Sequence, residues 1–265
     1  MIDLHGYRLL VTGGGSGIGR SIAEGACAAG GRVVVAGRRG QLLEEVVAGA
    51  AAGPGEMIAA PADVTDAEGV SSLVRTAVGS LGGIDGLVNA AGVHSIGAST
   101  ELDEEEFERV LRVNLVGAFR VTREVARVML DAGGGSIVQV ASLSGFGAFP
   151  GRLAYSVSKA GVVEMTLTLA AEWGHRGVRV NALVPGFVRT PIQESLIARG
   201  LLDIRALEAR TPLGRRAEPG DMVGPTLFLL SDAARFVTGH CLVVDGGWLP
   251  FVGPVDSYAG VDARH

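Results

Sequence analysis

Tyr155 and Lys159 are four residues apart in the segment AYSVSKAG, so a helix there would place both on one face. A free tyrosine has a pKa of about 10 and is a poor base at neutral pH. A positive charge beside the phenol favours the phenolate and lowers that pKa. The pair therefore predicts a group that donates and accepts protons, provided that other parts of the chain bring a reactant to it.

A glycine-rich turn near the start of the chain predicts a dinucleotide site. The segment LLVTGGGSGIGRSIA has the pattern of a strand, a turn and the start of a helix, with Gly13, Gly17 and Gly19 spaced as T-G-x-x-x-G-x-G. Glycines let backbone N–H groups approach a pyrophosphate, and the N-terminus of a helix favours negative charge. We therefore expect this turn to hold the phosphates of a cofactor.

The end of the second expected strand indicates which cofactor is preferred. NAD sites usually offer a carboxylate to the ribose 2′-hydroxyl, whereas an arginine suits a 2′-phosphate. Gly37 occupies the expected carboxylate position, and Arg38 follows it. Because arginine is always charged and can form two hydrogen bonds with a phosphate, we predict NADP(H) rather than NAD(H). The alternative is that Arg38 and Arg39 only face solvent.

Short apolar segments alternate with longer alanine-rich segments along the chain. The segments expected to be strands are YRLLVTG, RVVVAGR, EMIAAPADV, GLVNAAG, SIVQVAS, VRVNALVPG and CLVVDGG. The segments expected to be helices are residues 17–30, 40–51, 66–81, 103–131, 155–175 and 219–231. This α/β alternation predicts a single-domain, Rossmann-type, doubly wound parallel sheet of about seven strands, flanked by helices on both faces.

Residues 187–216 interrupt this alternation between the last two strands. An insertion there would lie at the carboxyl ends of the strands, where doubly wound sheets bind ligands. We expect a lid over the substrate, with a pair of surface helices as the alternative. No change in composition marks a second domain, so residues 1–265 are expected to form one dinucleotide-binding and catalytic domain. The tail, residues 253–265, is expected either to fray or to cross to a neighbouring copy.

Composition and charge argue against several classes of protein. Apolar residues make up 48% of the 265 residues and charged residues 19%, which suits a large core and not a disordered chain. The net charge of −5 gives no reason to expect nucleic-acid binding, and no apolar run reaches the roughly 18 residues of a membrane span. The first residues lack the pattern of a secretory signal, and two cysteines suggest no disulfide framework. We therefore expect a cytoplasmic protein, and we predict no metal site.

An ordered series of motifs resembles the classical short-chain dehydrogenases/reductases, and among them the 3-oxoacyl reductases. The series covers about residues 5–250 and consists of TGGGSGIG, ADV at 62–64, NAAG at 89–92, RVNLVG around Asn114, VASLSG around Ser142, YSVSK at 155–159, NALVPG at 181–186 and VDGGW at 244–248. Any single motif could arise by chance, but the ordered series is specific. The resemblance implies an NAD(P)-dependent oxidoreductase with a catalytic tetrad of Asn114, Ser142, Tyr155 and Lys159.

The resemblance also implies a role for each member of this tetrad. Tyr155 would protonate a carbonyl oxygen in reduction and take the proton of an alcohol in oxidation. Lys159 would bond the nicotinamide ribose, Ser142 would bond the substrate oxygen, and Asn114 would hold a water that links Lys159 to solvent. The structural alternatives are a packed tyrosine, a solvated lysine, an asparagine in a helix kink and a serine that caps a turn.

The contacts implied for the cofactor extend over most of the motifs. Asp63 would bond the adenine amino group, and Val64 would pack beside the ring. Pro185, Gly186 and Thr190 would contact the nicotinamide end. The full set expected to bind the cofactor is Gly13, Ser16, Gly17, Ile18, Gly19, Arg38, Asp63, Val64, Asn89, Ala90, Gly92, Tyr155, Lys159, Pro185, Gly186, Val188 and Thr190.

Residues that contact the substrate have no comparable pattern. The candidates are His94, Ser144, Phe149, Arg152, Phe187 and residues 191–210. Arg152, three residues before Tyr155, could bind a carboxylate or another acidic group, and a solvent-facing arginine is the alternative. His94 could touch the substrate or lie at the rim of the site.

We predict an oxidoreductase that transfers a hydride between NADP(H) and a small-molecule ketone or secondary alcohol. The family resemblance implies a homotetramer or homodimer that pairs through residues 103–131 and 155–175, whose apolar residues exceed what one face of a sheet needs. An enoyl- or dienoyl-thioester reductase is one alternative function, and a sensor that binds cofactor without turnover is another. The sequence predicts neither the substrate nor the direction of the reaction.

Overall fold

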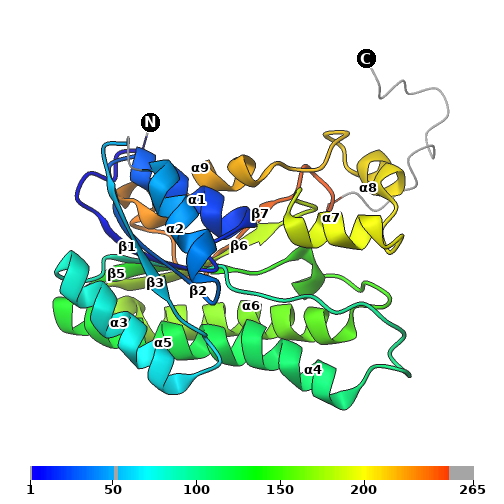
Figure 1. Cartoon of the computed structure of the whole chain (residues 1–265), viewed down its shortest axis with the longest axis horizontal. Coiled ribbons are helices and arrows are strands. Elements are labelled where there is room, and N and C mark those ends of the chain that lie inside the picture. Colours follow the sequence, from blue (N-terminus) through cyan, green and yellow to red (C-terminus); the bar gives the residue numbers. More distant parts are fainter. Residues whose placement is uncertain (1, 51–52, 251–265) are drawn as a thin grey trace.

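The computed structural model describes residues 2–50 and 53–250, so the expected tail at 253–265 lies outside the described residues. All seven expected strands are present and form one parallel sheet in the order β3-β2-β1-β4-β5-β6-β7 (Figure 1). The strands are β1 (Arg8–Thr12), β2 (Arg32–Gly37), β3 (Glu56–Pro61), β4 (Gly86–Asn89), β5 (Gly135–Val140), β6 (Val178–Pro185) and β7 (Cys241–Val244). The prediction of a doubly wound sheet is confirmed.

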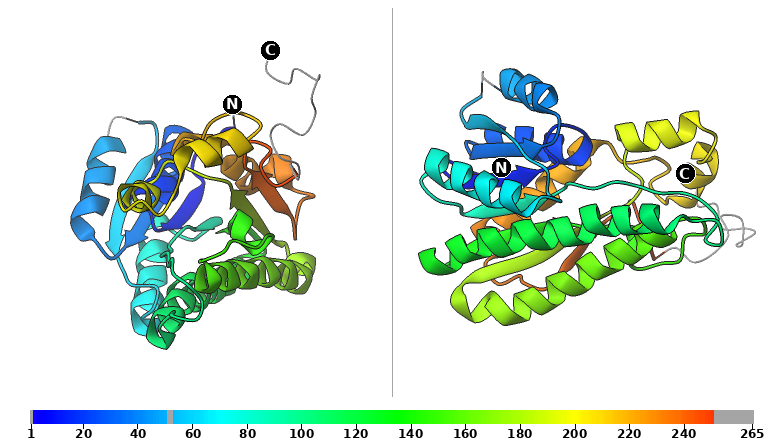
Figure 2. Two further views of the ribbon diagram at one scale, coloured as in Figure 1. Left: turned by 90° about the vertical axis from the view of Figure 1, so that its right-hand side faces the viewer. Right: turned by 60° about the horizontal axis from the view of Figure 1, so that its bottom comes forward.

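Helices cover both faces of the sheet (Figures 1 and 2). One face carries α1 (Gly17–Ala28), α2 (Gly40–Ala50) and α9 (Val223–Leu230), and the other carries α3 (Ala67–Leu81), α5 (Ala118–Ala132) and α6 (Leu153–Trp173). Successive strand residues point to opposite faces of the sheet and belong to two different hydrophobic cores. Leu9 and Val11 pack with α1, while Leu10 packs with α3 and α5. Burial on both faces explains why the strands are continuously apolar.

The helix expected over residues 103–131 is not uniform. It consists of α4 (Glu104–Leu111), a π-helical turn at Arg112–Gly117 and α5. Such wide turns are rare and often lie at functional sites. Asn114 lies inside this turn. Its side-chain amide accepts a hydrogen bond from the Val93 N–H and donates one to the Val93 carbonyl oxygen. The alternative of an asparagine in a helix kink therefore describes part of what Asn114 does, since a contact with a distant segment accompanies the change in helix geometry.

The expected insertion between β6 and β7 contains two short helices, α7 (Pro191–Ala198) and α8 (Ile204–Arg210). They project beyond the two helical layers, as the yellow segments of Figures 1 and 2 show. Four short 3₁₀ segments complete the helical elements of the described residues: Leu143–Gly145, Gly174–Arg176, Pro219–Met222 and Asp232–Ala234. Within residues 2–50 and 53–250, no helix has both the length and the apolar character needed to cross a membrane.

Candidate active site

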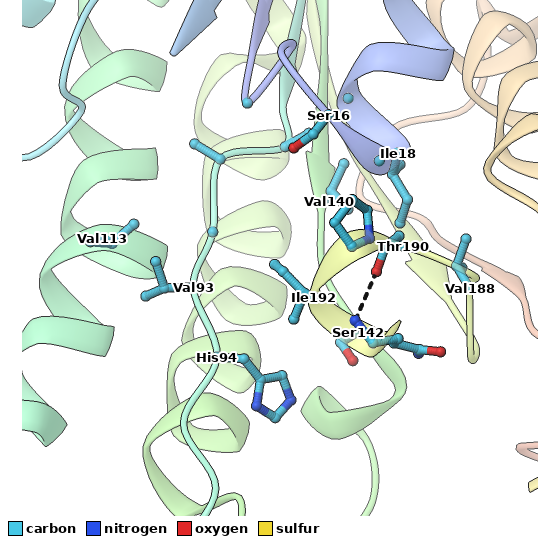
Figure 3. A pocket seen from close by; sticks show the side chains of 18 of the residues that line it. Ser16, Ile18, Val93, His94, Val113, Val140, Ser142, Val188, Thr190 and Ile192 are labelled. Atoms are coloured by element: carbon cyan, nitrogen blue, oxygen red, sulfur yellow. Dashed lines mark hydrogen bonds between the residues drawn. The ribbon is translucent and has the colours of Figure 1, made fainter. Parts of the chain in front are cut away.

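A cavity of about 710 Å³ collects the residues that follow β1 to β6, and α7 contributes to its wall. In Figure 3, Ser16 and Ile18 lie at one end of this cavity and His94 lies toward the other. Every residue predicted singly to bind cofactor or substrate, or to act in catalysis, lines the cavity except Asn89 and Asn114. Of the candidate range 191–210, the residues that line it are Pro191, Ile192, Gln193, Ser195, Leu196, Arg199 and Leu202. Residues that are far apart in the sequence therefore meet at one edge of the sheet, as expected for a doubly wound fold.

The glycine-rich turn fits a phosphate group because its backbone is packed too closely for side chains. Gly13 has a φ of +69°, and a Cβ atom there would lie 2.6 Å from the backbone carbon of Ala90. A Cβ atom on Gly19 would overlap the carbonyl oxygen of Gly13. The first turn of α1 begins at Gly17 and also lines the cavity. Its N–H groups have no partners within the helix, so the turn can present them to an anion.

Both arginines that follow β2 line the same end of the cavity. Arg39 donates a hydrogen bond to the Ser16 hydroxyl at 3.4 Å. Burial alone would raise the pKa of Asp63, but hydrogen bonds from Thr65 and the charge of Arg38 together lower it. Two cations therefore lie between the expected phosphate and adenine positions. Our sequence reasoning selected only Arg38, although the adjacent Arg39 carries the same signal.

Tyr155 lies in the first turn of α6 and is stacked on His94. The two ring centroids are 4.2 Å apart, with 23° between the ring planes. Burial raises the pKa of Tyr155, against the opposing effects of a hydrogen bond with Ser142 and the charge of Arg152. The expectation of a lowered pKa for Tyr155 is therefore wrong for the protein alone, because desolvation of the phenol outweighs the nearby positive charge.

Lys159 lies beneath Tyr155, and its side chain is buried. Its Nζ is 5.7 Å from the centroid of the tyrosine ring and donates a hydrogen bond to the carbonyl oxygen of Val140 at 2.7 Å. Burial lowers the pKa of Lys159 to about 8. The amine is consequently mostly protonated at neutral pH, and the predicted proximity of the two side chains is confirmed.

The two asparagines outside the cavity wall act within the fold. Asn114 donates to the Val93 carbonyl and the Ser158 hydroxyl and accepts from the Val93 N–H, at 2.8 to 3.1 Å. Asn89 donates to Thr122 and accepts from Thr12, so it joins β1, β4 and α5. The side-chain amide of Asn89 is thus hydrogen-bonded within the core. In this segment Ala90 and Gly92, and not Asn89, line the cavity where the cofactor is expected.

An aromatic wall lies beyond Tyr155. Phe149 stacks on Trp248 with centroids 5.3 Å apart, and Phe187 meets both rings edge-on. Arg152 lies over Phe149 and Phe187. Ser144 donates its N–H to the Ser142 hydroxyl oxygen at 3.2 Å.

His94 is a neutral ring at pH 7, because burial and, second to it, the charge of Arg152 lower its pKa to about 4. The five predicted substrate residues therefore form one end of the cavity.

Comparisons with known proteins agree with this geometry. A family model described as enoyl-(acyl carrier protein) reductase matches residues 13–249. A 2,5-dichloro-2,5-cyclohexadiene-1,4-diol dehydrogenase of Sphingobium indicum is 38% identical over 94% of this chain and 99% of its own. A 3-oxoacyl-[acyl-carrier-protein] reductase of Thermotoga maritima is 37% identical over 92% of this chain and 98% of its own. The chain belongs to the short-chain dehydrogenase/reductase family.

A solved structure gives a similar result for this short-chain dehydrogenase/reductase. It is provisionally described as an NAD(P)-dependent gluconate 5-dehydrogenase of Beutenbergia cavernae, with NADP bound at low occupancy. The two chains are 42% identical, with a TM-score of 0.88, and the match covers 94% of this chain and 99% of the other. The coarse function, an oxidoreductase with a Rossmann-type sheet, is therefore established for this chain.

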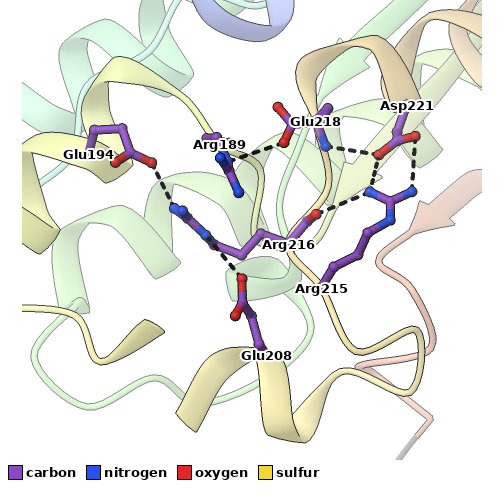
Figure 4. Close-up of polar contacts among 7 residues, drawn as sticks. All are labelled: Arg189, Glu194, Glu208, Arg215, Arg216, Glu218 and Asp221. Carbon is purple, nitrogen blue, oxygen red and sulfur yellow. Dashed lines mark hydrogen bonds and ion pairs between the residues drawn. The ribbon is translucent and has the colours of Figure 1, made fainter. Parts of the chain in front are cut away.

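In this short-chain dehydrogenase/reductase, a group of ion pairs joins the insertion to the segment before α9 (Figure 4). Arg216 has a side chain that is only 5% exposed, and it meets Glu194 of α7 at 2.9 Å and Glu208 of α8 at 3.8 Å. Its neighbour Arg215 forms a more exposed pair with Asp221 at 2.6 Å. Sequence reasoning missed both Arg216 and Trp248 as parts of the site's support, although Trp248 ends the recognised VDGGW motif.

Proposed function

We propose that the protein transfers a hydride between NADP(H) and a ketone or secondary alcohol, with Tyr155 as the general acid and base. One observation carries this proposal. Tyr155 lines the same cavity as the glycine-rich turn and lies between Ser142 and Lys159. A dinucleotide held by that turn would reach the end of the cavity where Tyr155 and Ser142 can meet a reacting oxygen.

The bound nicotinamide supplies or accepts the hydride. Because the pKa of Tyr155 is raised, its hydroxyl is protonated at neutral pH and can donate a proton to a carbonyl oxygen. Ser142 lies within hydrogen-bonding reach of the same hydroxyl and can stabilise the charge that develops on that oxygen. The Lys159 ammonium, 5.7 Å from the ring centroid, favours the phenolate that remains. In oxidation the phenolate takes the proton of the alcohol.

Asn114 has a positioning role in this proposal. Both hydrogens of its amide are donated, to Val93 and to Ser158. The Asn114 amide nitrogen therefore has no hydrogen left for the water expected to connect Lys159 with solvent. That water would bind to a carbonyl oxygen of Asn114 instead. By holding Val93 and Ser158, Asn114 fixes the segment after β4 against the helix that carries Tyr155 and Lys159.

The preference for NADP(H) over NAD(H) is also a proposal. Arg38 and Arg39 line the adenosine end of the cavity, where a 2′-phosphate would gain two cationic neighbours. The NADP bound by the Beutenbergia cavernae relative supports this assignment. Asp63 would bond adenine, Val64 would pack beside it, and Pro185, Gly186, Val188 and Thr190 would contact the nicotinamide end.

A paired assay tests the proposed reaction. NADPH and NADH oxidation would be measured against a panel of ketones, and NADP⁺ reduction against the matching alcohols. We expect turnover with NADPH that falls by about 10²- to 10⁴-fold in Tyr155→Phe, while cofactor binding is unchanged. Tight cofactor binding with no Tyr155-dependent turnover on any carbonyl or alcohol would contradict the proposal and support the sensor alternative.

Reduction of an enoyl thioester is a second candidate, because the matching family model carries that description. Carbonyl chemistry is better supported, since Ser142 and Tyr155 are both positioned to bond a substrate oxygen. A direct comparison of an enoyl thioester with its 3-oxoacyl counterpart separates the two reactions. Faster turnover of the enoyl compound would favour the second candidate.

We further propose that residues 1–265 act as one catalytic domain in which α7 and α8 form a lid, since Ile192 and Leu196 of α7 line the cavity. Pairing into a homodimer or homotetramer through α5 and α6 is supported by exposed apolar side chains, among them Phe119 and Leu167. A cytoplasmic location is also proposed, and the free thiols of Cys27 and Cys241 suit a reducing compartment.

A further inference from the structure

Arg152 is a cation without an anionic partner at the proposed reaction site. It lines the cavity, it is partly buried, and its guanidinium forms no ion pair or hydrogen bond with any residue in the part of the chain that the structure describes. Burial lowers its pKa and only Tyr155 opposes this, so no carboxylate contributes to the balance. The solvent-facing arginine that the sequence left as an alternative therefore does not describe this residue. An arginine in such surroundings loses hydration and gains no counter-ion from the protein.

Two aromatic rings hold this guanidinium at the cavity wall. Its central carbon is 5.6 Å from the centroid of Phe149 and 5.8 Å from that of Phe187. Stacking of this kind favours the cation and restricts the side chain while leaving N–H groups at its edge for an acceptor. The charge of Arg152 also acts on Tyr155 and His94. An anion bound by Arg152 would therefore lie close to the reacting oxygen.

The surroundings of Arg152 supply no competing negative charge. Among the described residues that line the cavity, only Asp63 carries a carboxylate, and it follows β3 at the adenosine end. Arg109, which lines the cavity near His94, is already paired with Glu106 through bonds of 2.6 and 2.8 Å. Arg199, which follows α7, also lines the cavity but is exposed. Arg152 is thus the partly buried, aromatic-stacked arginine close to the proposed proton donor.

We infer that the substrate carries a carboxylate close to its reacting carbon and that the Arg152 guanidinium binds it. Compact hydroxy acids and oxo acids are the class that combines such a carboxylate with a reacting alcohol or ketone. The inference rests on the proposed carbonyl chemistry at Tyr155 and adds the charge of the substrate to it. Arg152 determines specificity in this account, whereas proton transfer remains with Tyr155.

The test compares short oxo acids of graded chain length with their methyl esters, using NADPH and the full chain. In the wild type we expect kcat/KM to be at least about 10-fold higher for the best acid than for its ester, as for a charge-assisted hydrogen bond. Arg152→Gln, which keeps much of the side-chain length, should lower kcat/KM for the acid by about 10- to 100-fold, mainly through KM. Its effect on the ester should be less than about threefold, since the ester has no charge to lose.

Arg210 offers a matched control. It stacks on Trp248 of the same aromatic cluster, 3.6 Å from the ring centroid, but it does not line the cavity. Arg210→Gln should leave the ratio of acid to ester unchanged. Equal losses on acid and ester in Arg152→Gln, or no loss on either, would overturn the inference and assign Arg152 to packing.

A binding measurement separates the failure of this inference from that of the proposed function. Calorimetry would compare hydroxy acids with their amides on the NADP⁺-loaded protein, in the wild type and in Arg152→Gln. Tyr155-dependent turnover of neutral ketones without any preference for acids would overturn the inference and leave the proposed function standing. Arg152-dependent binding of acids without turnover in either direction would support the anion site and contradict the proposed reaction.

Discussion

The two ends of the cavity differ in how far backbone and side chains form their walls. At the cofactor end the glycine-rich turn packs backbone against backbone, and Gly13 fits only because it has no side chain where the turn meets Ala90. At the substrate end the wall consists of side chains from distant segments, with Phe149 before α6 and Phe187 after β6, and Trp248 after β7 packs behind both rings. Tyr155 and Lys159 lie between these ends on α6.

This difference shows which properties of the site can vary. A wall of closely packed backbone tolerates few substitutions, because any side chain must displace the chain that it touches. A wall of side chains can change its shape and charge while the sheet stays the same. We therefore expect substitutions in the glycine-rich turn to remove cofactor binding, and substitutions of the side chains that line either end to change what is bound.

Gly13→Ala should have the largest effect. The new methyl group would require an alanine at a φ of +69° with its Cβ 2.6 Å from the Ala90 backbone. We expect about 1–3 kcal/mol of lost stability and a loss of cofactor affinity of about 100-fold, measured by urea unfolding and by cofactor titration. Gly79 in α3 has nothing within 4 Å of its own Cβ position, so Gly79→Ala is the control and should be neutral or slightly stabilising. Unchanged NADPH binding in Gly13→Ala would contradict the steric account.

Arg38→Ala should reverse the preference between cofactors without damage to the fold. Because a 2′-phosphate would lose a charge-assisted partner, KM for NADPH should rise by about 10- to 100-fold while KM for NADH stays the same. Arg39→Ala shows whether the hydrogen bond to Ser16 makes an independent contribution. Equal changes in both cofactors would show that the arginines serve the fold or the general charge of the site.

Arg216→Met should weaken the substrate end and spare the cofactor end. Its guanidinium joins Glu194 of α7 to Glu208 of α8, and both acids are more exposed than the arginine. Without this link we expect the two helices to hold the proposed lid less firmly, so KM for the carbonyl compound should rise by roughly 3- to 10-fold. The adjacent Arg215→Met, which breaks a more exposed pair with Asp221, is the control. A similar loss of NADPH affinity in Arg216→Met would contradict the separation of the two ends.

His94 should make the smallest contribution, through the pH dependence of stability. Its pKa is lowered to about 4 in the folded protein, so between pH 6.5 and 4 the unfolded chain binds the additional proton. Stability is therefore fully present above about pH 6.5 and decreases as the pH falls toward 4. Between pH 7 and pH 6 the contribution of His94 is about 0.7 kcal/mol. Urea unfolding at both pH values should show a decrease smaller by that amount in His94→Gln, and equal decreases would refute a buried neutral His94.

Features that depend on neighbours in the chain could be predicted from the sequence. The seven strands follow from apolar segments, and the approach of Lys159 to Tyr155 follows from the spacing of a helix. The glycine-rich turn is likewise local, because one short segment contains the strand end, the turn and the start of α1. The order of these motifs was sufficient to bring almost the whole predicted site to one cavity.

Features that depend on distant contacts could not be predicted in this way. The π-helical turn accompanies hydrogen bonds between Asn114 and Val93, and the amide of Asn89 is occupied by Thr12 and Thr122. Burial of Tyr155 has a larger effect on its pKa than the charges around it, and no local pattern reveals how deeply a side chain is buried. Such contacts form only after the sheet has brought the segments together.

The position to which the hydride is transferred tests the central claim most directly. NADPH carrying deuterium at its hydride-donating carbon would be incubated with a ketone, an oxo acid and an enoyl thioester, and the products would be analysed by mass spectrometry and NMR. We predict deuterium on the former carbonyl carbon, with a yield that falls by about 10²- to 10⁴-fold in Tyr155→Phe. Deuterium found only on a former alkene carbon, or on no product in spite of bound NADPH, would contradict the account.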